Sequence, residues 1–251
     1  MAAFLTFALV APLASFGALA VGERRPTWDR PARSAVLGLT GACLGVERED
    51  DAAQSALAAD YGVALLCHAP GRLLADFHTA QVPPTRGKRR FATRAEELRA
   101  PDLATILSRR DYRTGAWHLV ALWARGPTPR WSLHDIAVAM RAPGFVPYLG
   151  RKACPLGLPL APLLNDAPSP GAALAQRHLT GPEARFRHMA DAAGEAFVAR
   201  DPWEGEADSG LLRRVETRRD QPRSRRRWQF DLRQEVIEAL PAPALAGEAS
   251  L

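Results

Sequence analysis

The sequence has few of the residues that build metal sites and disulfide frameworks. It holds three cysteines, Cys43, Cys67 and Cys154, far apart, without Cys-x-x-Cys spacing and without a histidine at metal-ligand spacing. A disulfide framework and a zinc site are therefore not expected; we expect no cofactor and a reducing, cytoplasmic location. The sequence also lacks the acidic cluster of a two-metal nuclease and the glycine-rich loop of a nucleoside triphosphate site.

Lysine is almost absent, although the chain is strongly basic. All but two of the 33 basic residues are arginine, and the formal net charge is +6 at pH 7. This charge favours a polyanionic partner, and arginine suits nucleic acid because its guanidinium forks onto phosphate and stacks on bases. A general bias toward arginine codons would give the same ratio, so both interpretations stay open. A hydrophobic content of 47% indicates a globular protein.

Residues 1–20 carry no charged side chain and end in small residues, as a secretory signal peptide does. They lack the basic residue that normally precedes the apolar core of such a peptide, and Pro12 interrupts them. The segment is also too broken to span a membrane. The alternative interpretation is a buried strand from Ala3 to Val10, covered on both faces, followed by a turn from Pro12 to Gly17.

An arginine-rich loop precedes the first predicted helix. Two prolines interrupt this loop, and its arginines are Arg24, Arg25, Arg30 and Arg33. Ser34 is expected to cap a helix that ends near Gly45, and its free N–H groups would bind phosphate together with the arginines. Gly38 and Gly41 are expected to let this helix lie close to a sheet. A solvated surface loop is the simpler alternative for the arginines.

Two further segments are strongly basic. Residues 81–110 are rich in arginine and poor in apolar residues, which predicts a protruding arm or hairpin. Residues 213–227 hold eight arginines and two acids, a net charge equal to that of the whole chain. Such a run is usually a solvated edge hairpin, and contact with RNA, target DNA or a neighbouring subunit is the alternative. Residues 165–212 indicate no function.

The order of the predicted elements is strand, helix, strand, strand, then strand and helix again. This order is typical of an α+β, ferredoxin-like unit, which RNA-recognition domains use. Four segments then form a distinctive set: Pro12–Gly17, Pro31–Gly45, Ser108–Tyr112 and Pro147–Leu156. Together they resemble the Cas-five family of RAMP subunits in Type I-E CRISPR Cascade complexes. The resemblance covers about residues 3–160 and 213–236.

The resemblance implies a ferredoxin-like (RRM/RAMP) palm with an inserted β-hairpin thumb. In this chain residues 1–80 would form the first part of the palm and residues 81–110 the basic thumb. Residues 111–240 would form the second part with a C-terminal basic hairpin, and residues 241–251 a disordered tail. Members of the family hold the 5′ handle of the CRISPR RNA and cap the backbone filament, beside a Cas-seven-family backbone subunit and the large PAM-reading subunit.

The chain would then be a non-catalytic RNA-binding subunit in antiviral defence that reaches target DNA through the complex and contacts no membrane. By position in the family motifs, Arg33 and Ser34 lie at the helix that meets the handle, and residues 148–152 form a glycine loop against RNA. Tyr148 or Trp28 would stack on bases, and Gly150 would let the backbone approach RNA, an ordinary turn glycine being the alternative. The expected RNA-binding residues are Arg25, Arg30, Arg33, Ser34, Lys88, Arg89, Arg90, Tyr148, Gly150, Arg151 and Lys152.

A metal-independent endoribonuclease that processes precursor CRISPR RNA is the alternative function. Relatives in Type I-C systems cut with a tyrosine, a lysine and an adjacent histidine, but this sequence has no Lys-His pair, and Lys152 is followed by alanine. His78 and His118 lie on apolar strands, where a hydrogen-bonded core or edge histidine is the expected role. The sequence therefore predicts no catalytic residue.

Overall fold

The computed structural model of the protein describes residues 1–251 except 19, 21, 84–89, 191–193, 206–208 and 242–251. The tail predicted to be disordered therefore lies outside the described residues apart from Pro241, and so do Lys88 and Arg89. Within the described part, one sheet has the strand order β6-β1-β5-β3-β7-β9-β8, and β2 and β4 also pair with β5. The strands are β1 (Ala2–Ala14), β2 (Arg24–Arg25), β3 (Tyr61–Ala69), β4 (Arg72–Val82), β5 (Ala104–Ala124), β6 (Leu163–Ala167), β7 (Phe197–Arg200), β8 (Leu212–Ser224) and β9 (Gln229–Ala239).

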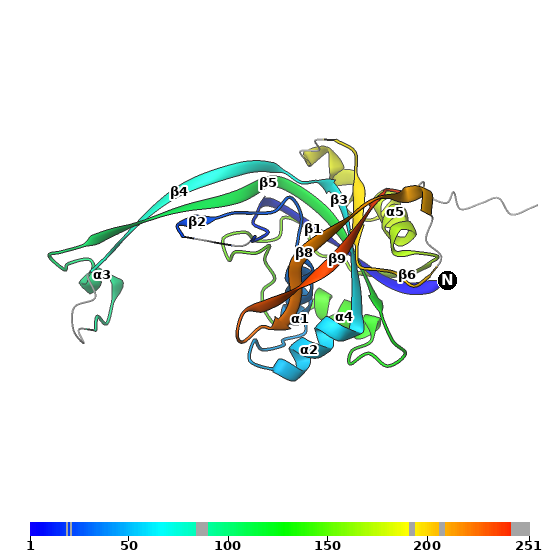
Figure 1. Ribbon diagram of the computed structural model, residues 1–251, viewed down its shortest axis with the longest axis horizontal. Helices are drawn as coiled ribbons and strands as arrows, with labels where there is room; N and C mark the ends of the chain where they lie inside the picture. The colour runs from blue at the N-terminus through cyan, green and yellow to red at the C-terminus, as the bar shows by residue number, and fades with distance from the viewer. Residues whose placement is uncertain (19, 21, 84–89, 191–193, 206–208, 242–251) are drawn as a thin grey trace, which may run out of the picture.

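Helices cover both faces of this sheet (Figure 1). They are α1 (Arg33–Cys43), α2 (Asp51–Asp60), α3 (Arg94–Glu97), α4 (Leu133–Arg141) and α5 (Pro170–Thr180), with 3-10 helices η1 (Ala184–Met189) and η2 (Ser209–Leu211). Side chains of α1, α2 and α4 join one core cluster, which includes Val36, Leu57 and Ile136. Leu174 of α5 joins a second cluster on the other face. No described helix is both long enough and apolar enough to cross a membrane.

Strand β1 lies inside the sheet, between β5 and β6, as the apolar sequence of residues 3–10 predicts. Leu5, Phe7 and Leu9 enter the first core cluster, while Phe4 and Ala8 point to the second. A strand covered on both faces needs apolar side chains at successive positions rather than alternating ones. The strand continues past the predicted turn at Pro12 and ends at Ala14.

A long hairpin extends from the body of the protein (Figure 1). Strands β4 and β5 pair from Arg72↔Thr114 to Val82↔Ala104, and α3 lies near the far end. The paired segment thus begins before residue 81, where the arm was expected to start. Its exposed apolar side chains include Phe77, which is 67% exposed, so the hairpin is less purely basic than its sequence indicates.

The β8–β9 hairpin ends the sheet, with β8 as its edge strand. The arginines of this hairpin lie on both faces of the sheet, because successive side chains along a strand point to opposite faces. Arg218 and Asp220 are buried, whereas Arg219 between them is exposed. The run is therefore only partly the solvated surface that its composition suggests.

His118 in β5 is fully buried, and neither ring nitrogen has a hydrogen-bond partner among the described residues. It is a core histidine as expected, but it is not hydrogen-bonded. Burial, together with the nearby charges of Arg30, Arg113 and His68, lowers its pKa from 6.5 to about 3. His78, in contrast, is exposed on the projecting hairpin.

This buried histidine predicts a loss of stability in acid. The unfolded chain protonates the imidazole below pH 6.5 while the folded chain does not, so stability falls as the pH falls from 6.5 toward about 3. Between about pH 7 and pH 5 this one group should lower the free energy of unfolding by about 2 kcal/mol. Urea titrations over this range should show a shallower pH dependence for His118→Phe than for the parent. An identical dependence in both would contradict the buried, neutral state.

Candidate nucleic-acid interface

The N-terminus of α1 does not carry the phosphate site that the sequence predicts. Ala32 occupies the N-cap position without a side-chain cap, and Ser34 is the second residue of the helix. The backbone N–H of Arg33 donates to Asp220 Oδ2 at 2.9 Å. A carboxylate of β8 therefore already neutralises this helix end, and the prediction that Ser34 caps it is wrong. No local sequence pattern indicates this contact, because Asp220 lies 187 residues after Arg33 in the chain.

Arg33 and Arg30 point into the protein instead of toward solvent. The fully buried Arg33 pairs with Asp201 at 2.8 Å and donates to the carbonyls of Ala58 and Tyr61. Burial lowers the pKa of Arg33, and the carboxylate of Asp201 opposes this. The RNA contact predicted for these two arginines is therefore not available in this structure.

Arg30 belongs to the same buried network of ion pairs. It pairs with Glu235 and Glu216, each at 2.6 Å, and is 4% exposed. Burial alone would lower the pKa of Arg30, but Glu235 and Asp29 raise it above its ordinary value. Arg218 and Arg233 also pair with Glu235, so the network fastens the β8–β9 hairpin to the segment before α1.

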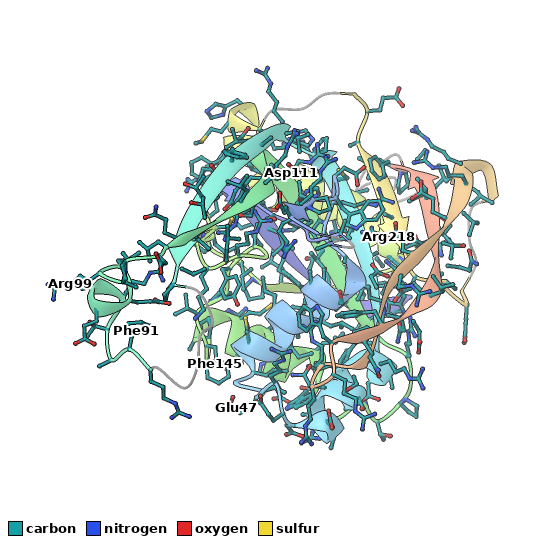
Figure 2. The ribbon with its side chains drawn as sticks, turned by 60° about the vertical axis from the view of Figure 1, so that its left-hand side comes forward. Glu47, Phe91, Arg99, Asp111, Phe145 and Arg218 are labelled. Carbon is teal, nitrogen blue, oxygen red and sulfur yellow. The ribbon has the colours of Figure 1, made fainter. Side chains whose placement is uncertain are left out.

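The root of the projecting hairpin carries a different set of arginines, which remain accessible. Strand β2 runs parallel to β5, with Arg24 beside Arg109 and Arg25 beside Arg110. Figure 2 shows Asp111 where the hairpin leaves the body and Phe91 and Arg99 at its far end. Because side chains alternate along a strand, Arg24 and Arg109 share the face of Asp111, and Arg25 and Arg110 share the face of Tyr112.

The two faces differ in charge balance. On the first face Arg24 lies 3.1 Å and Arg109 3.7 Å from Asp111, so their charges are partly neutralised. On the second face the guanidinium of Arg151 lies 4.4 Å from the centre of the Tyr112 ring. We call the arginines of this second face the root patch: Arg25, Arg110 and Arg151. In the described residues no carboxylate lies within ion-pair distance of any of the three.

The loop of residues 147–152 connects the root patch to a groove. Arg151 donates to the carbonyls of Asp111 and Arg25, each at 3.1 Å, which fixes the loop on β5 and β2. Leu149 is buried, and its carbonyl accepts from the N–H of Ser15 at 3.0 Å. Tyr148 is 40% exposed beside this anchor. The loop therefore presents an aromatic ring and a guanidinium close together in the sequence.

Gly150 is required by contact with the protein's own backbone. Its φ is +88°, and a Cβ at this position would lie 1.7 Å from the carbonyl oxygen of Ser15. The close approach predicted between Gly150 and RNA is thus made with the end of β1. A side chain here would displace Leu149 and Tyr148 from their places beside Ser15.

A groove of about 290 Å³ lies between α1, this loop and the β8–β9 turn. Tyr148 and Gly150 line one side, and Arg225 and Trp228 line another. Gly38 of α1 lies at the groove, where its missing side chain leaves room for Arg225 rather than for a sheet; only Gly41 meets another helix, at Leu57. Arg225 belongs to the run 213–227, for which contact with RNA was one alternative, whereas Trp228 was not singled out from the sequence. Its position directly after an arginine run was the available signal.

The predicted site residues therefore separate into groups. The root patch contains Arg25 and Arg151. The groove lining contains Tyr148 and Gly150. Lys152 is exposed at the end of the loop, and Arg90 is exposed toward the far part of the hairpin. Arg30, Arg33 and Ser34 belong to the buried network and to α1. In the described part of the chain, no group of three or more histidine, cysteine, aspartate or glutamate side chains is arranged to hold a metal ion.

Sequence comparison places this geometry in a family. A family model described as CRISPR-associated protein (Cas_Cas5) matches residues 4–234. The "CRISPR system Cascade subunit CasD" of Escherichia coli (strain K12) is 31% identical over an alignment of 198 residues, which covers 74% of this chain and 87% of that protein. The family match thus extends through the segment 165–212, for which the sequence motifs gave no assignment.

Solved structures show the same mixed fold with a large antiparallel sheet. A chain of a solved "CRISPR RNA-guided surveillance complex" has a TM-score of 0.62 and 26% identity, covering 98% of this chain and 94% of that chain. A "Crystal structure of Cas protein" has a TM-score of 0.60 and 24% identity, covering 97% of this chain and 100% of that chain, and supports the fold alone. With a family match over most of its length and a relative above 30% identity, the chain belongs to the Cas5 (Cas-five) family of CRISPR-associated proteins.

Proposed function

We propose that the protein is a CRISPR RNA-binding subunit of a Type I-E Cascade complex that holds the 5′ handle of the guide and caps the backbone filament. The relative is itself a Cascade subunit, and a similar structure comes from an RNA-guided surveillance complex. The observation that carries the proposal is the root patch. Its three arginines have no carboxylate partner in the described residues: Arg151 lies on the Tyr112 ring, and Arg25 and Arg110 share the face of that ring. The exposed Tyr148 belongs to the same loop as Arg151.

The chemistry of this surface suits single-stranded RNA. Guanidiniums bind phosphates, which position RNA without reading its sequence, and exposed aromatic rings stack on unpaired bases. Handle specificity then requires contacts to base edges or stacked bases, and the exposed ring of Tyr148 in the same loop as Arg151 would supply a stacking surface. The ion network behind α1 contributes rigidity and not RNA contacts, since Arg30 and Arg33 are buried.

The palm-and-thumb architecture is part of the same proposal. The order β6-β1-β5-β3, with α1 and α2 between β1 and β3 and α4 between β5 and β6, agrees with a ferredoxin-like palm. The β4–β5 hairpin would be the thumb, with paired strands from Arg72 to Thr114 rather than only residues 81–110. The backbone and PAM-reading subunits, target DNA within the complex and a cytoplasmic location belong to this proposal as its partners and setting.

The side chains of the projecting hairpin support a non-catalytic role. The nearest histidine in the sequence of the hairpin, His78, lies beside Asp76 at 3.9 Å, and no lysine adjoins it in the sequence. Metal-independent RNA cleavage needs a base near the 2′-OH and a cation for the developing charge. We therefore propose that the protein binds the guide without cutting it.

The proposal is tested by titrating the full chain into a fluorescently labelled handle RNA in EDTA. Anisotropy should show binding that weakens steeply between about 50 and about 200 mM salt, as expected when phosphate contacts release counterions. A gel of the same samples with a repeat hairpin should show intact RNA. Binding that is insensitive to salt, or a single discrete cut, would contradict the proposal.

A further inference from the structure

The tip of the β8–β9 hairpin holds two guanidiniums on one indole ring. The Cζ atom of Arg48 lies 5.0 Å from the ring centre of Trp228, and that of Arg225 lies 5.4 Å from it. Arg48 Nε also donates to the carbonyl of Arg225 at 3.2 Å. In the described residues neither guanidinium has a carboxylate within ion-pair distance. Two like charges held this close without a counterion attract an anion.

The local backbone is built to hold this arrangement. A Cβ on Gly38 would lie 2.0 Å from Arg225 Nη2, so only glycine in α1 leaves room for the guanidinium. Trp228 has a φ of +55°, in the left-handed region that bulky side chains rarely adopt, and is 60% exposed. The N–H of Trp228 donates to the carbonyl of Arg225 at 3.3 Å, so this conformation closes the β8–β9 turn and keeps the indole beside Arg225. Burial and the charge of Arg48 lower the pKa of Arg225, which is consistent with its lack of an acidic partner.

The shape of the groove limits what it can accept. Its volume of about 290 Å³ is at the small end of ligand pockets, and its α1 side is apolar at Ala35, Leu39 and Ala42. Tyr148 forms the wall on the loop side. One flat, largely apolar ring with an attached anion fits this combination, whereas a double helix does not.

We propose that this groove binds one unpaired nucleotide of single-stranded RNA. Arg225 and Arg48 bind its phosphate, Tyr148 stacks on its base, and Trp228 positions the two guanidiniums. The inference rests on the proposed RNA-binding function and adds a second contact region, which Tyr148 and Gly150 of the 147–152 loop line. RNA is favoured over an apolar protein segment because both guanidiniums lack a described counterion.

Arg225 and Tyr148 should affect binding of the handle RNA in different ways. Arg225→Ala should lower the affinity about fivefold or more and reduce the slope of log K against log salt by about 0.7, which corresponds to one phosphate contact on a single strand. Tyr148→Ala should lower the affinity without changing that slope, because stacking releases no counterion. Trp228→Ala should weaken binding and reduce the slope as Arg225→Ala does. Arg219→Ala, on the outward face of the same hairpin, is the matched control and should change neither quantity appreciably.

The melting temperature of each variant shows whether it folds. If Arg225→Ala does not fold, Arg225→Lys replaces it in the test; because lysine keeps the charge, this variant should retain most of the salt slope. The nucleotide groove would be overturned if the Arg225, Trp228 and Tyr148 variants bound RNA with parental affinity and salt slope. If root-patch variants lost binding in the same experiment, the proposed function would remain intact. Normal RNA binding with failed assembly into the complex would show that the groove docks a protein, which also overturns it. A parent chain with no salt-dependent RNA binding would refute the proposed function itself.

Discussion

Replacement of Arg33 by alanine should lower the free energy of unfolding by about 3 kcal/mol. The change removes one partner of a fully buried ion pair, and it leaves the carbonyls of Ala58 and Tyr61 without this donor. Arg125 and Arg233 still contact Asp201, which keeps the loss near the lower end of the range for broken buried pairs. Urea denaturation followed by circular dichroism measures the effect.

The matched control for Arg33 is Arg25→Ala. Arg25 is exposed, and within the described part of the chain its side chain donates only to nearby carbonyls, so its removal should change stability by about 0.5 kcal/mol or less. Arg33→Ala protein that remains folded should bind handle RNA with parental affinity. An Arg33→Ala variant as stable as the parent but deficient in RNA binding would place this side chain on the RNA surface and contradict the structure.

Replacement of Arg110 and Arg151 together should cause the largest loss of RNA binding. The two guanidiniums share the face of Tyr112 and have no described carboxylate partner, so their charges are not neutralised. Arg151 also donates to the carbonyls of Asp111 and Arg25, which holds its charge in place. Charge-assisted hydrogen bonds contribute enough that the double alanine variant should bind about tenfold or more weakly. The slope of log K against log salt should fall by about 1.4, about 0.7 for each phosphate contact.

Arg109→Ala provides the control for this pair. Arg109 belongs to the same strand, but it faces the opposite side and lies beside Asp111 at 3.7 Å. Its removal should change the salt slope little. Equal loss of affinity in Arg109→Ala and in the double variant would show that the charge of the strand, rather than one face of it, attracts RNA. Arg151→Lys should recover the slope but not the full affinity, because lysine stacks poorly on Tyr112.

The sequence predicted features that local patterns determine. Continuous apolar residues identified β1 as a strand covered on both faces, and the structure places it inside the sheet. The Ser-x-x-Asp pattern of Ser132 and Asp135 is likewise local, and both hydrogen bonds of this capping box are present at the start of α4. In both cases the determining residues lie within a few positions of one another.

The errors arose where the determining partner is distant in the sequence. Arg33 looks like a surface cation until the chain folds, because Asp201 lies 168 residues away. Gly38 suggested close packing on a sheet, but the atom that requires a glycine there belongs to Arg225. The root patch depends on the register of β2 with β5, which fixes which arginines share a face and which no local pattern encodes.

Cross-linking of handle RNA that carries 4-thiouridine to the full chain, followed by mass spectrometry of the linked peptides, locates the bound RNA without any substitution. Adducts are expected on peptides that contain Tyr112 and Tyr148 and near Arg225, and none on the buried side of α1 at Arg33. Adducts confined to the opposite face of β5, around Arg24 and Arg109, or to peptides remote from both the root patch and the groove, would contradict the proposed interface.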